Sequence, residues 1–234
     1  MKDYFNGANN LDDISNAARN IKLELEIPDE MPKYVPNSGS SILDSLSTEY
    51  FNNMLKEESI RKEYMKIGMF GFVSWRWIIP LSKWIGERKC LEVMAGRGWL
   101  SHALRTKGID VIATDNFSWN RPQFIQNWTD TVTDIEKIDA IDAVEKYGSK
   151  IDILIMSWPF RNNTAYKVIK TLYEINPNVL IIYIGEGNGG STANGDFFKS
   201  FSLIEDYEFE TVASHYQSWN MIKDGLFLGK YTGI

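Results

Sequence analysis

The chain has 234 residues and a formal net charge of -6, with one cysteine and two histidines. This length permits one sizeable hydrophobic core, extended by some further helices. The acidic balance disfavours broad contact with a phosphate backbone, so nucleic acid is not an expected partner. Cys90 cannot form an internal disulfide, and together with His102 and His215 it gives no zinc-ligand spacing, so no metal site is expected.

The first residues, Met1–Tyr4, do not begin an apolar signal segment, and no apolar run of the chain is long enough to span a bilayer. We therefore expect a cytoplasmic protein with no membrane partner. The sequence leaves the oligomeric state open.

Residues 1–87 are expected to form a helical extension. Apolar residues at helical spacing come first, a proline-rich loop follows, and the segment from Lys56 to Lys66 has the charge pattern of a solvated helical face. The aromatic stretch Met69–Pro80 has two interpretations. It is either a helix packed on a sheet or an aromatic lid over a ligand, with Trp75 as the lid residue.

From Cys90 onward, apolar runs typical of buried strands alternate with helical patterns. The expected strands are 89–94, 110–114, 132–137, 151–156, 178–184, 207–213 and 225–231. The expected helices are 99–107, 121–128, 140–147, 163–175 and 194–204. The alternation predicts an α/β domain over residues 88–234 with a doubly wound, mostly parallel seven-stranded sheet, whose last two strands form an antiparallel hairpin at its edge.

The stretch Cys90–Leu100 predicts a buried strand, a glycine turn and the start of a helix. Gly96 and Gly98 remove side chains where a ligand must approach the backbone closely. The next predicted strand ends at Asp115, whose carboxylate offers only acceptors and suits the two hydroxyls of a ribose. A glycine loop on a helix N-terminus, with an acid at the tip of the neighbouring strand, predicts a nucleoside-binding unit.

A second glycine-rich loop, Gly185–Gly195, follows the predicted fifth strand and should lie at the same edge of the sheet. Glu186 would project near the mouth of the site, where it is the best candidate for a general base or an amine-binding acid. The alternative is a solvent loop without a function.

These motifs resemble those of class I S-adenosylmethionine-dependent methyltransferases, over roughly residues 88 to 231. Glu92–Gly98 matches the first motif of the family, Asp115 its ribose-binding acid, Asp139–Ala140 its third motif and Ile153–Phe160 its fourth. The resemblance implies a Rossmann-like methyltransferase fold and S-adenosyl-L-methionine as the cofactor. The implied cofactor site consists of Glu92, Ala95, Gly96, Gly98, Asp115, Asp139, Ala140 and Ser157.

Methyl transfer suits a chain so poor in histidine and cysteine, because a sulfonium is a good leaving group and the reaction mostly needs an acceptor held in line and shielded from water. In such an enzyme Ser157 would accept a hydrogen from an amine, while Trp158 and Phe160 would stack on a flat substrate. The resemblance implies that the acceptor is a small molecule or a protein side chain. The chain departs from the family at Met94, where glycine is common, and at Trp158, where amino-methyltransferases have a proline.

Three other interpretations stay open. Met94 and Trp158 are compatible with a protein that binds S-adenosylmethionine without turnover. Gly96–Ser101 is a Gly-x-Gly-x-x-Gly pattern with serine in its third glycine position, which admits a nicotinamide-dependent oxidoreductase. Methylation of nucleic acid is the most remote of the three, because the chain is acidic.

Overall fold

The structure is a computed structural model that describes residues 26–32, 48–119 and 130–233. Its helices are α2 (Thr48–Lys66), α3 (Trp75–Ile85), α4 (Trp99–Thr106), α5 (Ala140–Tyr147), the short 3-10 helix η2 (Gly148–Lys150), α6 (Thr164–Ile175), α7 (Gly195–Ser200) and α8 (Tyr207–Ala213). Its strands are β1 (Cys90–Val93), β2 (Val111–Asp115), β3 (Glu136–Lys137), β4 (Ile153–Ser157), β5 (Leu180–Glu186), β6 (Phe201–Leu203) and β7 (Asp224–Tyr231).

The strands form one seven-stranded sheet in the order β3-β2-β1-β4-β5-β7-β6. The first five are parallel, whereas β7 runs antiparallel to both β5 and β6. The prediction of a doubly wound, mostly parallel, Rossmann-like sheet is therefore confirmed. The chain reverses its direction of winding between β1 and β4, which is where the ligands of such sheets bind, outside the carboxyl ends of the strands.

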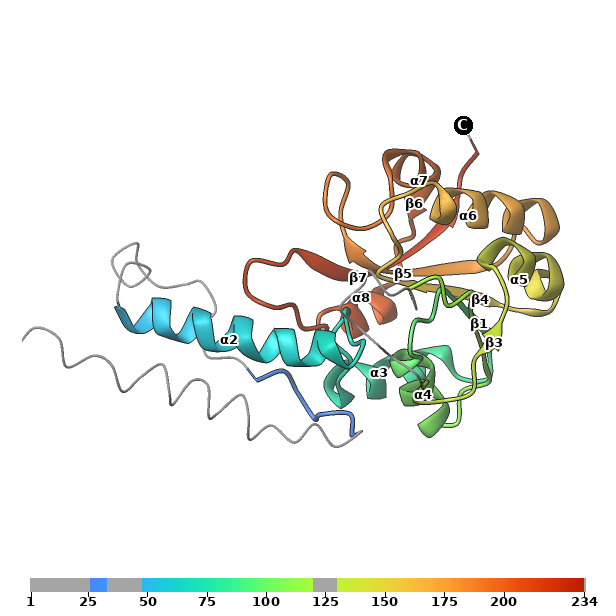
Figure 1. Cartoon of the computed structure of the whole chain (residues 1–234). Helices are drawn as coiled ribbons and strands as arrows, with labels where there is room; N and C mark the ends of the chain where they lie inside the picture. Colours follow the sequence, from blue (N-terminus) through green and yellow to red (C-terminus); the bar gives the residue numbers. More distant parts are fainter. Residues whose placement is uncertain (1–25, 33–47, 120–129, 234) are drawn as a thin grey trace, which may run out of the picture.

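Side chains alternate between the two faces of the central strands, because a strand has a period of two residues. Ile153 and Ile155 pack on the face that α3, α4 and α8 cover, whereas Leu154 and Met156 pack on the face covered by α5, α6 and α7. Figure 1 shows α3 and α4 below the sheet and α6 and α7 above it. Both faces are buried, which explains why these strands are continuously apolar.

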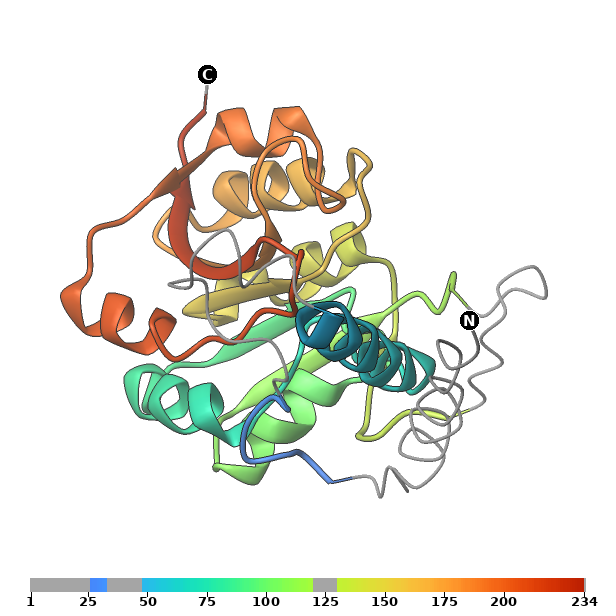
Figure 2. The ribbon, with the colours of Figure 1, turned by 90° about the vertical axis from the view of Figure 1, so that its left-hand side faces the viewer.

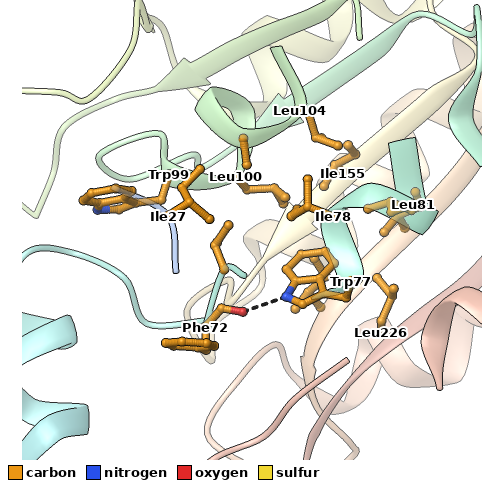
Figure 3. Close-up of a cluster of buried hydrophobic side chains, with 14 of the residues drawn as sticks. Ile27, Phe72, Trp77, Ile78, Leu81, Trp99, Leu100, Leu104, Ile155 and Leu226 are labelled. Carbon is orange, nitrogen blue, oxygen red and sulfur yellow. Dashed lines mark hydrogen bonds between the residues drawn. The ribbon is translucent and has the colours of Figure 1, made fainter. Parts of the chain in front are cut away.

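The N-terminal part of the chain shares the first of these two cores. Figure 3 shows Ile27 close to Trp99 and Leu100 of α4, with Phe72, Trp77 of α3 and Leu226 of β7 in the same cluster. The indole Nε1 of Trp77 donates a hydrogen bond of 2.9 Å to the carbonyl oxygen of Phe72. Helix α3 thus packs on the sheet as the first interpretation of the aromatic stretch expects. The proposed domain boundary near residue 87 stays a prediction.

Two predictions near the C-terminus are wrong. Residues 207–213 form helix α8 rather than a strand, so a helix separates the two final strands and they do not form a simple hairpin. Asp206 caps this helix by accepting a hydrogen bond of 2.9 Å from Phe209 N, and Phe209 and Val212 are buried at a spacing of three residues. Aromatic residues alternate with glutamates over Tyr207–Glu210, and this alternation favours a strand over a helix in the sequence. The predicted helix 194–204 ends at Ser200, and β6 follows it directly.

The other elements lie close to their predicted positions, with one shortened and one untested. The predicted strand 132–137 is reduced to Glu136–Lys137 at the edge of the sheet. The predicted helix 121–128 and the apolar stripe before residue 26 lie outside the described residues. Across the described ranges, no helix combines the length and apolar character that crossing a membrane requires.

Candidate functional site

A cavity of about 710 Å³ lies at the carboxyl ends of β1, β2 and β4. This is the position at which the winding of the sheet reverses, and the volume is within the range of small-molecule sites. Helix α2 and the segment 68–71 form the opposite wall, and Figure 2 shows α2 almost end-on in front of the sheet. The cavity therefore has a floor made by the sheet edge and a wall made by the N-terminal part of the chain.

The glycine turn after β1 forms part of the floor. Gly96 and Gly98 have positive φ angles of 58° and 86°. A Cβ added at Gly96 would meet open space, whereas one at Gly98 would lie 2.8 Å from Ile135 Cδ1 and 2.9 Å from Thr133 Cγ2. Gly96 is thus free to face a ligand, and Gly98 is required for packing. Met94 adopts the same left-handed region, with φ of 58°, which explains why glycine is frequent at this position in the family that the sequence resembles.

Asp115 ends β2 beside this turn and is only 5% exposed. Its Oδ2 accepts a hydrogen bond of 2.8 Å from Gly96 N. Its Oδ1 accepts one of 2.6 Å from Phe117 N and one of 3.0 Å from Trp119 Nε1. Burial raises the pKa of Asp115, while these hydrogen bonds act in the opposite direction. The carboxylate therefore fixes the glycine turn and also lines the cavity.

Glu92 lies on β1 and points to the face that α4 covers, where Ser101 Oγ donates a hydrogen bond to its Oε2. It is almost fully buried and lines the cavity. Burial raises its pKa from 4.5 to about 7, although the hydrogen bonds from Ser101 and the charge of Arg105 lower it. The cavity floor therefore contains a carboxyl group whose pKa lies near neutral pH.

Asp139 and Ala140 line the cavity at the start of α5. Asp139 caps this helix by accepting a hydrogen bond of 3.0 Å from Ile141 N, and its Oδ2 accepts one of 3.2 Å from Asn116 Nδ2. The predicted cofactor residues Glu92, Ala95, Gly96, Asp115, Asp139, Ala140 and Ser157 all line this one cavity. Gly98 does not line it, and its lack of a Cβ leaves room for Ile135 and Thr133 to pack against the turn.

The loop after β4 forms the side of the cavity nearer to β5. Ser157 and Trp158 line it, and Trp158 has a left-handed φ of 50°. The indole Nε1 of Trp158 donates a hydrogen bond of 3.0 Å to Asp224 Oδ2, which also accepts one of 2.7 Å from Tyr216 OH. A Cβ at Gly71 would lie 2.8 Å from Trp158 Cδ1, so this glycine allows the wall to approach the loop closely. Trp158 is therefore held rigidly beside the cavity.

Phe160 also lines the cavity, although 58% of it is exposed. It pairs in an antiparallel bridge with Thr192 of the second glycine-rich loop, and Ala193 N donates a hydrogen bond of 3.1 Å to Pro159 O. The two loops are thus joined into one rim.

Besides Gly98, two predicted site residues do not line the cavity, Glu186 and Trp75. The carboxylate of Glu186 is bonded within its own loop, where Oε2 accepts a hydrogen bond of 2.7 Å from Ser191 N, and this bond lowers its pKa. Trp75 lies at the start of α3, with Lys107 Nζ 4.3 Å from its ring centroid, and lines a separate, more open hollow. Trp75 is therefore not a lid over the main cavity, and a role for Glu186 as general base loses its geometric support.

The helical face Lys56–Lys66, expected to be solvated, instead contributes Arg61 and Met65 to the wall of the cavity. The aromatic stretch is divided between its two interpretations, because Met69–Gly71 line the cavity whereas the part from Trp75 onward packs as helix α3. Arg97, between the two glycines, attaches the wall to the floor: its Nη1 donates a hydrogen bond of 2.9 Å to Ile67 O, and Nη2 forms an ion pair of 2.7 Å with Asp130. Trp99 Nε1 donates to the same carbonyl at 2.8 Å. The signals for this wall in the sequence are the arginine between the two glycines and the aromatic stretch that begins at Met69.

No protein-family model and no curated protein matches the chain. Its fold is similar to that of a SAM-dependent methyltransferase from Archaeoglobus fulgidus, at 16% identity over 75% of this chain and 98% of that one, with a TM-score of 0.43. It is similar to magnesium protoporphyrin IX methyltransferase (ChlM) from Synechocystis PCC 6803 with bound SAM, at 11% identity over 76% and 84% of the two chains, with a TM-score of 0.43. MtNAS in complex with MTA and tNA is similar at 12% identity over 95% and 87%, with a TM-score of 0.43. These similarities concern the fold alone.

Proposed function

We propose that the protein is an S-adenosylmethionine-dependent methyltransferase whose acceptor is a small molecule. The observation that carries this proposal is the hydrogen bond of 2.8 Å between Gly96 N and Asp115 Oδ2 in the main cavity. It joins the glycine turn after β1 to the acid that ends β2, an arrangement suited to holding a nucleoside. The wall formed by α2 favours a small acceptor over a protein side chain, because it covers the approach to the sheet edge.

S-adenosylmethionine fits the groups of the floor. Asp115 Oδ2 accepts one hydrogen bond from the protein and has capacity for a second, from a ribose hydroxyl. Gly96 leaves open space for the nucleoside, and Asp139 with Ala140 would lie beside the adenine. The buried carboxyl group of Glu92 would be drawn to its ionised form by the positive charge of this cofactor.

When bound, the sulfonium supplies an activated methyl group. The protein then has to hold the acceptor in line with that group and exclude water. No hydrogen bond joins Ser157 Oγ to another residue of the described ranges, so this hydroxyl is available to accept a hydrogen from the acceptor. Trp158 and Phe160 offer apolar surfaces beside it.

Calorimetric titration with S-adenosylmethionine and S-adenosylhomocysteine tests the proposal. We expect both to bind the wild-type protein, and Asp115→Ala to weaken binding by about 1–3 kcal/mol because ribose hydroxyls lose their acceptor. Asp115→Asn, which keeps the size of the side chain, is the matched variant if Asp115→Ala does not fold. Unchanged affinity in both variants, or no binding of either compound at millimolar concentration, would reject the proposal. Binding of a nicotinamide cofactor instead would favour an oxidoreductase.

A further inference from the structure

We infer that the acceptor is a compact apolar molecule with a carboxylate, which Arg61 of α2 binds. This inference rests on the proposed function, because it assigns the acceptor to the part of the cavity that the cofactor would leave free. Arg61 lines the cavity and, among its lining residues in the described ranges, is the one lysine or arginine. The acids Glu92, Asp115 and Asp139 all belong to the floor.

The contacts of α2 place Arg61 on the acceptor side. Glu57, one helical turn earlier on the same face, accepts a hydrogen bond of 2.6 Å from Asn220 N in the loop before β7. At the other end, Ile67 O accepts hydrogen bonds from Arg97 and Trp99 beside the glycine turn. With a rise of 1.5 Å per residue, Arg61 lies about 6 Å along the axis from Glu57 and about 9 Å from Ile67. Along the helix axis it therefore lies nearer to the contact with the loop before β7 than to the contact with the glycine turn.

Among the described residues, the charge of Arg61 is only partly neutralised. Its side chain is 18% exposed, and its Nη1 lies 3.5 Å from Glu58 Oε2, whose side chain is 43% exposed. Lys62 also pairs with Glu58, at 3.6 Å, so the two cations share one carboxylate. The pKa of Glu186 at the end of β5 is lowered mainly by the hydrogen bond from Ser191 N, and the field of Arg61 makes a small contribution in the same direction. A single positive charge that Glu58 neutralises only in part matches a singly charged carboxylate better than a doubly charged phosphate.

The largest side chains that line the wall and rim are apolar. Met65 of α2, Met69 and Phe70 of the wall, and Trp158 and Phe160 of the rim line this part of the cavity. Methionine and aromatic side chains bind flat or irregular apolar groups, whereas a guanidinium fixes the orientation of an acid. The combination selects an apolar body with an acidic end.

A pair of variants on one helix tests this inference. The probes are benzoate, phenylacetate, 3-phenylpropanoate and 4-phenylbutanoate, each compared with its neutral amide, titrated into protein saturated with S-adenosylhomocysteine. We expect at least one acid to bind wild type at least tenfold more tightly than its amide. Arg61→Gln should abolish that preference, whereas Lys62→Gln, which alters the same ion-pair network outside the cavity, should keep it.

Three results would overturn the inference: no acid binds, acids and amides bind equally, or Arg61→Gln weakens S-adenosylhomocysteine tenfold while leaving 5′-methylthioadenosine unaffected. The last result would assign Arg61 to the carboxylate of the cofactor. If S-adenosylhomocysteine does not bind wild type at all, the proposed function fails separately. The same acids titrated into the free protein then still test Arg61.

Discussion

The floor and the wall of the cavity are built from different parts of the chain. The floor consists of the glycine turn, three carboxyl groups and the start of α5, all within residues 92–140 and all placed by neighbouring parallel strands. The wall and rim, formed by α2, the segment 68–71 and the loops after β4 and β5, carry the large apolar side chains and the one guanidinium of the lining, with smaller polar side chains on the rim. The floor suits a ligand common to many proteins, and the wall suits one particular acceptor.

Backbone strain marks the sheet edge that both regions share. Met94, Phe117, Trp158 and Ala193 have positive φ angles between 49° and 58°, and they lie in the loops after β1, β2, β4 and β5. Residues other than glycine adopt this conformation at a cost of about 1–2 kcal/mol each. Such strain persists where the surrounding structure over-determines the backbone, and two of these residues, Met94 and Trp158, line the cavity.

The two glycines of the turn after β1 allow a role in packing to be distinguished from a role in ligand contact. Gly98→Ala should lower the free energy of unfolding by about 2–4 kcal/mol, because it adds a left-handed alanine and a clash with Ile135 and Thr133. Gly96→Ala should cost only about 1–2 kcal/mol, since its Cβ meets open space. Urea denaturation measures both.

Ligand binding should rank these two variants in the opposite order. The methyl group of Gly96→Ala would occupy the space of the nucleoside, so we expect calorimetry to show at least a tenfold loss of S-adenosylhomocysteine affinity, equivalent to about 1.4 kcal/mol. If Gly96→Ala binds as wild type does, Gly96 does not contact the ligand and the assignment of the floor is wrong.

A second test concerns Glu92, the buried acid of the floor. Burial raises its pKa from 4.5 to about 7. Between these two pH values, Glu92 is therefore protonated in the folded protein and ionised in the unfolded chain. The free energy of unfolding should therefore fall as the pH rises between about 4.5 and 7. Glu92→Gln removes this titration and should stabilise the protein at pH 8 by roughly 1–3 kcal/mol, while weakening S-adenosylmethionine binding.

The control for Glu92→Gln is Glu145→Gln on the exposed side of α5, which should change stability by less than about 0.5 kcal/mol. Urea denaturation at pH 5 and pH 8 separates the two variants. A Glu92→Gln protein whose stability has the same pH dependence as wild type would show that Glu92 is ionised in the folded state.

The same contrast explains which features could be predicted from the sequence. Gly96, Asp115 and Asp139 follow predicted strands or start a predicted helix, so short-range rules place them together at the sheet edge. Arg61 reaches the cavity only because Glu57 and Ile67 attach α2 to two separate loops, which no local pattern reports. Helix α8 was missed because alternating residues concealed the spacing of Phe209 and Val212 and the cap at Asp206.

The smallest effect is expected at Glu186, on the rim. Its carboxylate accepts the 2.7 Å hydrogen bond from Ser191 N and has a lowered pKa, which makes it a weak base that does not line the cavity. Once an acceptor is identified, we expect Glu186→Gln to leave S-adenosylhomocysteine affinity intact and to reduce turnover by less than about tenfold, whereas a general base contributes about 10²–10⁴-fold. Ser157→Ala, in the cavity, is the comparison and should lose more. A loss of a hundredfold or more in Glu186→Gln would require the rim loop to move and bring this carboxylate to the acceptor, and the division between floor and wall would then apply only to the structure without ligand.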